Sequence, residues 1–319
     1  MQAVHTFTSS LTIGSPTLVD GLGAYPLFRA ADSTPFYDTL SEAVRAGTLH
    51  ISEMSEAGVV PQLRVVNDGA RPVLIVDGEE LVGAKQNRIV NLTVLVPERS
   101  TMTLPVTCVE AGRWRRVSPE FVPAERAFYA SGRRDKLGQV TASMRTLGAA
   151  LADQSAVWSE IAHKSERLGA ASPTRAAAAM YEQRRDALDR IVSSFPPADR
   201  QVGAIFTIRG AVVGLDAFDH PRTWAQMVPK LLRSYGLDTL DSAAAGSGPA
   251  AADPLRFLEA VAHAGCTVYP AVGAGIDLRF EGGGIVGAAL DTAKGVVHMV
   301  AFPASDVVQP TGRRWFRRP

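Results

Sequence analysis

Short apolar runs rich in β-branched residues recur along both ends of this 319-residue chain, separated by turn-forming residues. Such runs are typical of short strands in antiparallel sheets. Between residues 134 and 195 the pattern changes, and apolar positions follow the three-four spacing of a helix face. This order predicts an α+β protein, mainly antiparallel sheet, with a helical hairpin inserted between N- and C-terminal sheet regions.

We expect one α+β domain and a short tail. Residues 1–303 would form the domain, with an N-terminal sheet region (1–130), the helical hairpin (134–195) and a C-terminal sheet region (200–303). The tail, residues 304–319, is basic and aromatic. The apolar seam of the hairpin is predicted to be core and not a partner interface, because each helix offers the other a packing surface.

Local signals sharpen these boundaries. The first helix of the hairpin should run from about Leu137 to Gly169, and the second from Ser172 to about Val192. Residues 6–13 alternate apolar and polar side chains, which predicts a strand. Residues 63–66 and 73–76 flank Asn-Asp-Gly, which tolerates positive φ, so we expect these two runs to pair as a hairpin.

Composition limits the classes of function. Hydrophobic residues make up 46% of the chain and charged residues 20%, which is a globular composition. A net charge of +1 argues against nucleic acid as the partner, because polyanion binders need a basic surface. The N-terminus lacks a signal peptide, no apolar run could span a bilayer, and two cysteines fit a reducing compartment. We therefore expect a cytoplasmic protein without membrane contact.

The fifteen residues from Asp77 to Asn91 hold three acids, two bases, two Asn and one Gln, although apolar strand-like runs frame them. Polar side chains on rigid elements indicate a site. Its candidate catalytic groups are carboxylates that could serve in acid/base chemistry, together with one from a later strand: Glu79, Glu80 and Glu110. If a divalent metal is bound, Mg²⁺ or Mn²⁺ suits these oxygen ligands.

Neighbouring side chains on a strand point to opposite faces, so only one of Glu79 and Glu80 should face a given site. The candidate ligand-binding bases would hold a phosphate or carboxylate: Lys85, Arg88 and Arg113. The candidate amides would orient a sugar hydroxyl or a base edge: Gln86, Asn87 and Asn91. The alternative is that Arg88 pairs with one of the glutamates and that the amides satisfy backbone groups of a turn.

The segment from Pro105 to Trp114 is a second polar constellation. Strand alternation puts Cys108 and Glu110 on one face, and Cys108 is predicted to be a buried structural thiol. Trp114 could stack on a base or pack into the core. Elsewhere, His220 precedes a helix and should cap it, and Asp277 and Arg279 are close enough in sequence to pair with each other.

The known sequence signatures of catalysis are missing. The six histidines have no metal-binding spacing, and the chain lacks a phosphate-binding P-loop, a dinucleotide fingerprint and a nucleophile elbow.

The sequences GEELVGAKQNR (residues 78–88) and CVEAGRW (residues 108–114) resemble the ADP-ribosylglycohydrolase- and rhodanese-phosphatase-associated protein family, a domain of unknown function. Residues 203–218, 224–235 and 277–302 also follow its pattern, so the resemblance covers most of the chain. The resemblance implies that genes of this family are associated with genes for enzymes of ADP-ribose and phosphate chemistry.

Two hypotheses follow. In the first, the protein binds a small anionic ligand, phosphorylated or nucleotide-like (of ADP-ribose type), and in the stronger form of the hypothesis hydrolyses it. In the second, it is a non-catalytic binding or assembly module whose polar strip is an internal network that fixes strand register. The sequence leaves the oligomeric state open.

Overall fold

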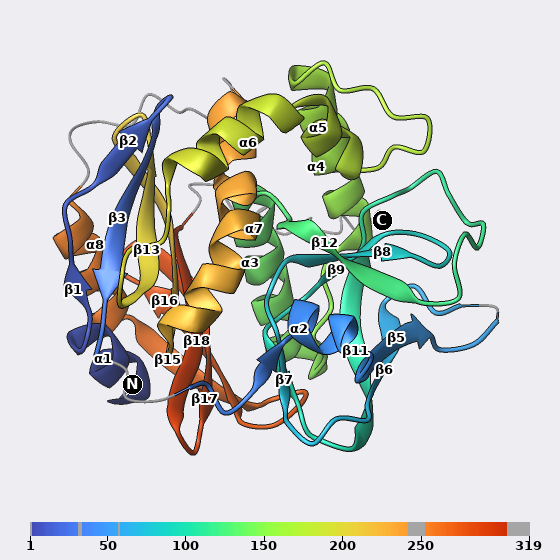
Figure 1. Ribbon diagram of the computed structural model, residues 1–319, viewed down its shortest axis with the longest axis horizontal. Coiled ribbons are helices and arrows are strands. Elements are labelled where there is room, and N and C mark those ends of the chain that lie inside the picture. Colours follow the sequence, from blue (N-terminus) through green and yellow to red (C-terminus); the bar gives the residue numbers. More distant parts are fainter. Residues whose placement is uncertain (1, 31–33, 57, 242–252, 305–319) are drawn as a thin grey trace, which may run out of the picture.

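The computed structural model describes residues 2–30, 34–56, 58–241 and 253–304. These residues form eight helices and three sheets, and nearly all strand pairs are antiparallel (Figure 1). The α+β class and the mainly antiparallel sheets are therefore confirmed. The tail predicted from residue 304 onward lies outside the described residues, except for Ala304.

One sheet of nine strands occupies the left side of Figure 1. Its order is β1-β3-β13-β14-β18-β17-β16-β15, and β2 pairs with β3. Its strands are β1 (Thr12–Ile13), β2 (Thr17–Val19), β3 (Leu22–Phe28), β13 (Gln201–Ile208), β14 (Ala211–Phe218), β15 (Gly265–Pro270), β16 (Ile276–Gly282), β17 (Ile285–Thr292) and β18 (Gly295–Pro303). Tyr25 lies opposite Ile205, so the first strands of the chain belong to the sheet built by its C-terminal part.

The right side of Figure 1 holds a six-stranded sheet, β12-β8-β9-β11-β6-β5, and a three-stranded sheet, β10-β7-β4. These strands are β4 (Asp38–Thr39), β5 (Leu49–Glu53), β6 (Gln62–Asn67), β7 (Val73–Ile75), β8 (Glu79–Gly83), β9 (Arg88–Val90), β10 (Val94–Val96), β11 (Ser100–Cys108) and β12 (Phe121–Ala127).

The hairpin predicted between β6 and β7 is wrong, because β6 pairs with β5 and β11 whereas β7 pairs with β10 and β4. The Asn67 amide donates to the carbonyls of both Arg71 and Pro97, each at 2.9 Å. These bonds hold the turn between β6 and β7 against the loop that precedes β11, so the turn does not close a hairpin.

The helices are α1 (Gln2–Ser9), α2 (Leu40–Arg45), α3 (Ala130–Leu147), α4 (Gln154–Arg167), α5 (Ala178–Gln183), α6 (Arg185–Ser194), α7 (Pro221–Leu240) and α8 (Pro254–His263). The inserted segment is helical as expected, but it holds four helices and not a hairpin of two. Gly148 ends α3 with a left-handed φ of 65°, and Asp153 begins α4 by accepting bonds from two backbone N–H groups. Of the strand expected over residues 6–13, residues 6–9 belong to α1 and Thr12–Ile13 form β1. Val4 and Phe7 of α1 are buried against the nine-stranded sheet.

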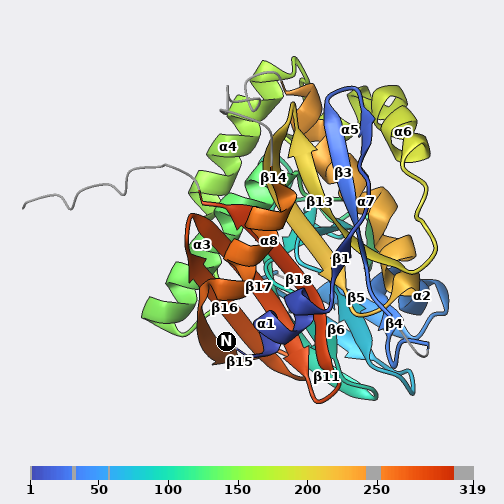
Figure 2. The ribbon, with the colours of Figure 1, turned by 90° about the vertical axis from the view of Figure 1, so that its left-hand side faces the viewer.

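Helix α7 joins the two sides of the molecule, since it packs on β12 of one sheet and on β13 of the other (Figures 1 and 2). Its Tyr235 stacks on Phe206 of β13 with ring centroids 3.9 Å apart, and Trp224 lies in the same core cluster. In the part of the chain that the structure describes, no helix is both long and apolar enough to cross a membrane.

Buried ion pairs also join the two sides. Arg133 of α3 meets Asp216 of β14 at 2.6 Å, and both side chains are fully buried. The Lys136 ammonium bonds Asp77, just before β8, and the carbonyls of Val90 and Asn91. Paired charges of this kind hold α3 in a fixed position relative to the polar segment from Asp77 to Asn91.

Candidate functional site

The turn between β8 and β9 carries most of the polar strip, and the structure links six of the nine predicted site residues into one network. Strand pairing sets Glu80 opposite Ile89 and Leu81 opposite Arg88, which places the intervening loop beside the end of β11. The network consists of Glu80, Gln86, Asn87, Arg88, Glu110 and Arg113. All six are buried or nearly so, and Arg113 retains 13% of its side-chain exposure.

Asn87 is the centre of this network. Its amide nitrogen donates to Glu80 Oε1 at 3.2 Å, and its backbone N–H donates to Glu110 Oε2 at 3.2 Å. Its amide oxygen accepts from Arg113 Nη2 at 3.1 Å. The side chain thus uses its donor and its acceptor capacity inside the protein, and it joins two carboxylates that lie 30 residues apart in sequence.

Glu110 and Arg113 form a close pair, with 2.6 Å between Oε2 and Nη2. Burial disfavours the charge on Glu110, but hydrogen bonds from Arg113, Thr174 and the Asn87 backbone outweigh burial and lower its pKa. This carboxylate is consequently ionised at neutral pH and already shared among donors, so it is a poor general acid.

Arg88 is fully buried and only partly satisfied. Its Nη1 donates to the backbone and side-chain oxygens of Gln86, whereas Nε and Nη2 have no hydrogen-bond partner among the described residues. Burial lowers its pKa from the ordinary arginine value, and the negative charge of Glu53 opposes that shift without cancelling it. The Arg88 guanidinium lies 5.8 Å from the ring centre of Trp114, which is 48% exposed.

Cys108 lies opposite Arg88 on β11, with Sγ 3.0 Å from Gln86 Oε1. It is fully buried, and burial raises the pKa of its thiol in spite of the opposing charge of Arg88. A buried, protonated thiol is unreactive, which supports a structural role for this residue.

The other three predicted site residues, Glu79, Lys85 and Asn91, are not part of this hydrogen-bond network. Glu79 points to α7 and pairs with Lys230 at 2.7 Å, while Glu80 points to β12. Asn91 donates to the Ala150 carbonyl and accepts from Thr107, so it ties α3's C-terminal loop to β11. Lys85 lies over the Trp114 ring at 5.2 Å.

The network reaches a cavity at Arg126 of β12. Glu80 accepts from Arg126 Nε at 2.6 Å and from Nη2 at 3.0 Å, and the guanidinium also lies over the Tyr181 ring at 5.4 Å. A two-point bond and an aromatic face together fix the plane of the guanidinium. Its charge stays in place at the protein surface, where 16% of the side chain is exposed.

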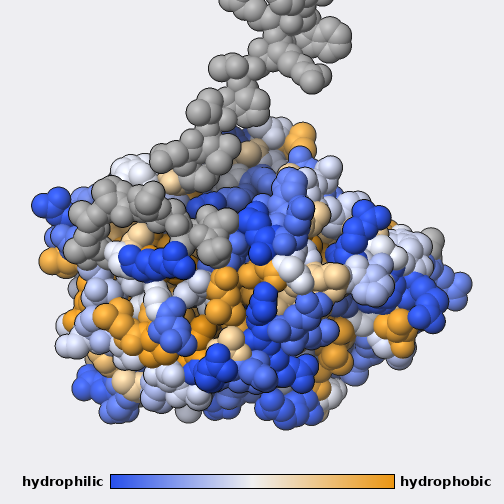
Figure 3. All heavy atoms as spheres, turned by 90° about the horizontal axis from the view of Figure 1, so that it is seen from above, coloured by the Kyte–Doolittle hydropathy of each residue, from blue (hydrophilic) through white to orange (hydrophobic). Residues whose placement is uncertain are grey.

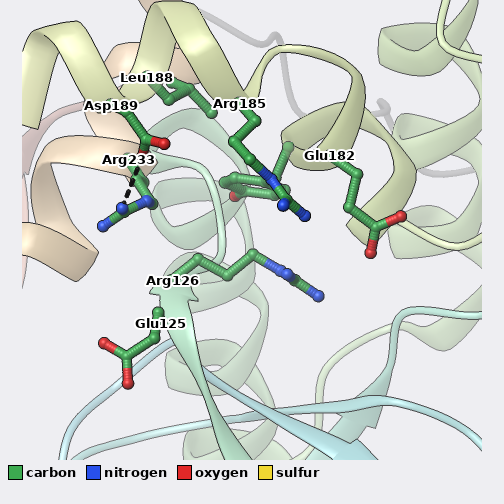
Figure 4. A pocket seen from close by; sticks show the side chains of 8 residues that line it. Glu125, Arg126, Glu182, Arg185, Leu188, Asp189 and Arg233 are labelled. Carbon is green, nitrogen blue, oxygen red and sulfur yellow. Dashed lines mark hydrogen bonds and ion pairs between the residues drawn. The ribbon is translucent and has the colours of Figure 1, made fainter.

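This cavity, which we call the Arg126 cavity, has a volume of about 210 Å³ (Figure 4). Its walls come from β12, α5, α6 and α7, and they consist of Glu125, Arg126, Tyr181, Glu182, Arg185, Leu188, Asp189 and Arg233. Figure 4 shows the Arg126 and Arg185 guanidinium groups on the same side of the cavity, beside Glu182. Arg233 pairs with Asp189 at 2.8 Å at the other end.

Sequence reasoning missed the three arginines of this cavity. Arg126 directly follows Glu125 in a strand whose other residues are apolar, and its partner, Glu80, lies 46 residues earlier. Arg185 and Arg233 resemble exposed helix residues in sequence, and only the packing of α6 on α7 brings them together.

The described residues do not fit a divalent metal. No three His, Cys, Asp or Glu side chains gather as a metal site within residues 2–30, 34–56, 58–241 and 253–304. The carboxylates proposed as ligands are instead each paired with a base: Glu79 with Lys230, Glu80 with Arg126, and Glu110 with Arg113.

Comparison with known proteins gives one match. The model of the ARG and Rhodanese-Phosphatase-superfamily-associated Protein domain, ARPP-1, matches residues 10–302. No curated protein and no solved structure matches the chain. The matched range contains the polar network and every wall of the Arg126 cavity.

Proposed function

Since the chain belongs to the ARG and Rhodanese-Phosphatase-superfamily-associated Protein family, we propose that it binds a small phosphorylated, nucleotide-like ligand of ADP-ribose type in the Arg126 cavity. The family name connects the chain with ADP-ribose and phosphate chemistry only by association. The physical support comes from the cavity itself.

The observation that carries the proposal is the fixed guanidinium of Arg126. Glu80 occupies its Nε and Nη2, and among the described residues nothing accepts a hydrogen bond from its Nη1. Arg185 makes no hydrogen bond or ion pair within the described chain, and it points to the same space. Two such groups suit a phosphate, because charge-assisted bonds from arginine to phosphate oxygens are strong and directional.

The remaining walls suit the sugar of such a ligand. Glu125 and Glu182 accept no hydrogen bond from the described residues, although the charge of Glu182 acts on Arg126, and carboxylates accept hydrogen bonds from ribose hydroxyls. Tyr181 and Leu188 add an apolar surface. A volume of about 210 Å³ is smaller than the roughly 300–1,000 Å³ of drug-sized sites. The cavity would therefore hold the phosphate and ribose, with the rest of the ligand outside.

The geometry favours binding over hydrolysis by the glutamates that the sequence singled out. Glu79, Glu80 and Glu110 are each shared with a base, so none offers a free carboxylate to a substrate. We propose instead that Glu80 and Asn87 are positioning residues for Arg126. In a hydrolytic form of the function, Glu182 would be the carboxylate available to act on the bound ligand.

The test is isothermal titration calorimetry with ADP-ribose, ribose 5-phosphate and inorganic phosphate. Arg185→Gln removes one exposed guanidinium, and Arg190→Gln is the matched control on the same helix, exposed and away from the cavity. Loss of one charge-assisted hydrogen bond should weaken ADP-ribose binding by about tenfold or more in Arg185→Gln. Arg190→Gln should bind as the wild type does.

Two outcomes would contradict the proposal: no heat of binding with any of the three compounds, or equal affinity in both variants. The first would favour the alternative of a non-catalytic assembly module. Chromatography of the ADP-ribose after overnight incubation separates binding from hydrolysis. Turnover lost in Glu182→Gln but kept in Glu125→Gln would identify the carboxylate that acts.

A further inference from the structure

A second cavity, with a volume of about 380 Å³, lies between α3 and the β15–β16 hairpin. It is larger than the Arg126 cavity, and the two share no wall residue. Its walls are Thr141, Arg145, Gly265, Cys266, Thr267, Tyr269, Arg279 and Glu281. We call it the Arg279 cavity.

Arg279 provides a fixed positive charge at the back of this cavity. Its side chain is 2% exposed, and Asp277 accepts from its Nε at 2.5 Å and from its Nη2 at 2.8 Å. Its Nη1 donates to nothing in the described chain, yet the residue lines the cavity. A buried arginine that is oriented by a carboxylate and keeps a donor for a cavity is suited to an anion.

The mouth of the cavity carries a second, displaceable charge. Arg145 of α3 lies 3.5 Å from Glu281 of β16, and the two side chains are 59% and 46% exposed. Exposed pairs of this length contribute little stability, so an incoming anion can take Arg145 from Glu281 at small cost. The freed Glu281 carboxylate then repels a second negative charge on the ligand, and it can accept a hydrogen bond from a ligand hydroxyl group.

The remaining walls offer hydroxyl and backbone groups. Three residues with hydroxyl groups line the cavity, namely Thr141, Thr267 and Tyr269, and the Thr141 hydroxyl already donates to the Leu137 carbonyl. The consecutive residues Gly265, Cys266 and Thr267 all line it, which a single face of a strand cannot provide. The cavity therefore borders an edge of β15, which in the part of the chain that the structure describes pairs with β16 alone.

We propose that the Arg279 cavity binds a small organic anion that carries one negative group and several hydroxyls, such as a hydroxycarboxylate or a monophosphorylated polyol. Arg279 and Arg145 hold the negative group. Thr267, Tyr269 and the edge of β15 bind the hydroxyls. This site is independent of the ligand proposed for the Arg126 cavity.

Isothermal titration calorimetry tests the site directly. A thiol probe would not serve, because Cys266 lies opposite Phe280 on β16 and packs on the other face of the sheet from Arg279. The compounds titrated are glycerate and glycerol 3-phosphate, which distinguish a carboxylate from a phosphate, and glycerol is the neutral control.

Glycerate or glycerol 3-phosphate should bind with measurable heat, whereas glycerol should not. Arg145→Gln removes a charge at an exposed position, so the protein should still fold, and its dissociation constant for the anion should rise by about tenfold. Arg256→Gln, on an 85% exposed side chain outside the cavity wall, should bind as the wild type does.

Arg185→Gln separates this proposal from the first. It should leave the affinity for glycerate and glycerol 3-phosphate unchanged, even if it abolishes binding in the Arg126 cavity. The proposal is overturned if neither glycerate nor glycerol 3-phosphate binds, if glycerol binds equally well, or if Arg145→Gln and Arg256→Gln have the same affinity.

Discussion

At the scale of single residues, Asp216 has three partners in the protein interior. It accepts from Arg133 through both oxygens, from Tyr235 at 2.8 Å, and lies 3.4 Å from His298 Nε2. Burial alone would raise the pKa of this carboxyl, but the positive charge of Arg133 and the bond from His298 lower it to about 2. The carboxylate is therefore charged in the folded protein across the physiological range.

Asp216→Asn should destabilise the protein by about 3–5 kcal/mol at pH 7, because it removes the closest counter-charge of the buried Arg133 and leaves only Asp77 at 3.5 Å. The folded pKa is below the unfolded value of about 3.9, so the stability from this group is present above pH 4 and is lost as pH falls toward 2. Urea denaturation should show the difference between wild type and variant shrinking over that range. An equal difference at pH 7 and pH 2.5 would contradict this account.

Asp219 shows the opposite behaviour. Burial raises its pKa to about 6, and the hydrogen bond from Tyr37 only partly offsets the shift. The folded protein then holds a proton that the unfolded chain releases between about pH 4 and 6, so this group reduces stability as pH rises through that window. Asp219→Asn keeps an acceptor for Tyr37 and should raise the melting temperature at pH 8 but not at pH 4. Unchanged melting at pH 8 would rule out this burial effect.

Local sequence predicted some of these residue-level features. His220 does cap α7, with Nδ1 accepting from the Arg222 N–H, and Asp277 does pair with Arg279 two residues later. Arg133 and Lys136 could not be predicted as buried, because their stretch of α3 resembles an exposed helix and their partners, Asp216 and Asp77, are distant in sequence. Short-range pairs follow from spacing, whereas long-range pairs depend on the fold.

At the scale of elements, the start of α3 is capped from another helix. Tyr129, at the N-cap position, makes no side-chain cap bond, and Asp238 of α7 takes that role. Its carboxylate accepts from the Ser131 N–H at 2.6 Å and the Ser131 hydroxyl at 2.9 Å, and it pairs with Lys164 of α4 at 2.6 Å. One carboxylate therefore connects three helices.

Asp238→Asn should cost about 1–3 kcal/mol, since it weakens a cap and removes a charge from a buried pair. Amide exchange should accelerate in the first turn of α3 more than in its last turn. The control is Asp186→Asn, at an exposed position in the first turn of α6. Equal losses of stability in the two variants would contradict the capping role.

Helix boundaries also show the limit of periodicity. The three-four spacing continues from Leu137 to Leu168, but Gly148 ends α3 and Asp153 begins a separate helix. Gln154 of α4 exchanges hydrogen bonds with both backbone groups of Cys108, so the break lets α4 lie beside β11. The spacing of apolar residues predicts which residues are buried. It does not show whether they belong to one helix or to two helices that run in different directions.

At the scale of the whole molecule, the nine-stranded sheet depends on the N-terminus. β3 lies between β1 and β13, and Leu22 and Leu27 are fully buried. The sequence predicted sheet regions on both sides of the helices but could not predict that β3 crosses to the C-terminal sheet. Strand patterns show that a segment pairs, and they do not show with which partner.

Removal of residues 2–29 should therefore abolish cooperative unfolding, because it exposes the entirely buried strand β13 as a sheet edge. In the intact protein, tryptophan fluorescence and far-ultraviolet circular dichroism should report a single shared transition in urea, as expected for sheets joined by α7 and buried ion pairs. A truncated protein that keeps the wild-type transition would show that β3 is dispensable.

The position of β3 also has a consequence for synthesis on the ribosome. The strand leaves the ribosome long before its partner, since Phe28 pairs with Gln201. At about 5–20 residues per second, the wait between the two is roughly 10–35 s. During that time β1 and β2 can pair with one edge of this apolar strand, but its other edge has no partner. The nascent chain thus presents to chaperones, or to neighbouring nascent chains, a strand edge that β13 covers in the finished protein.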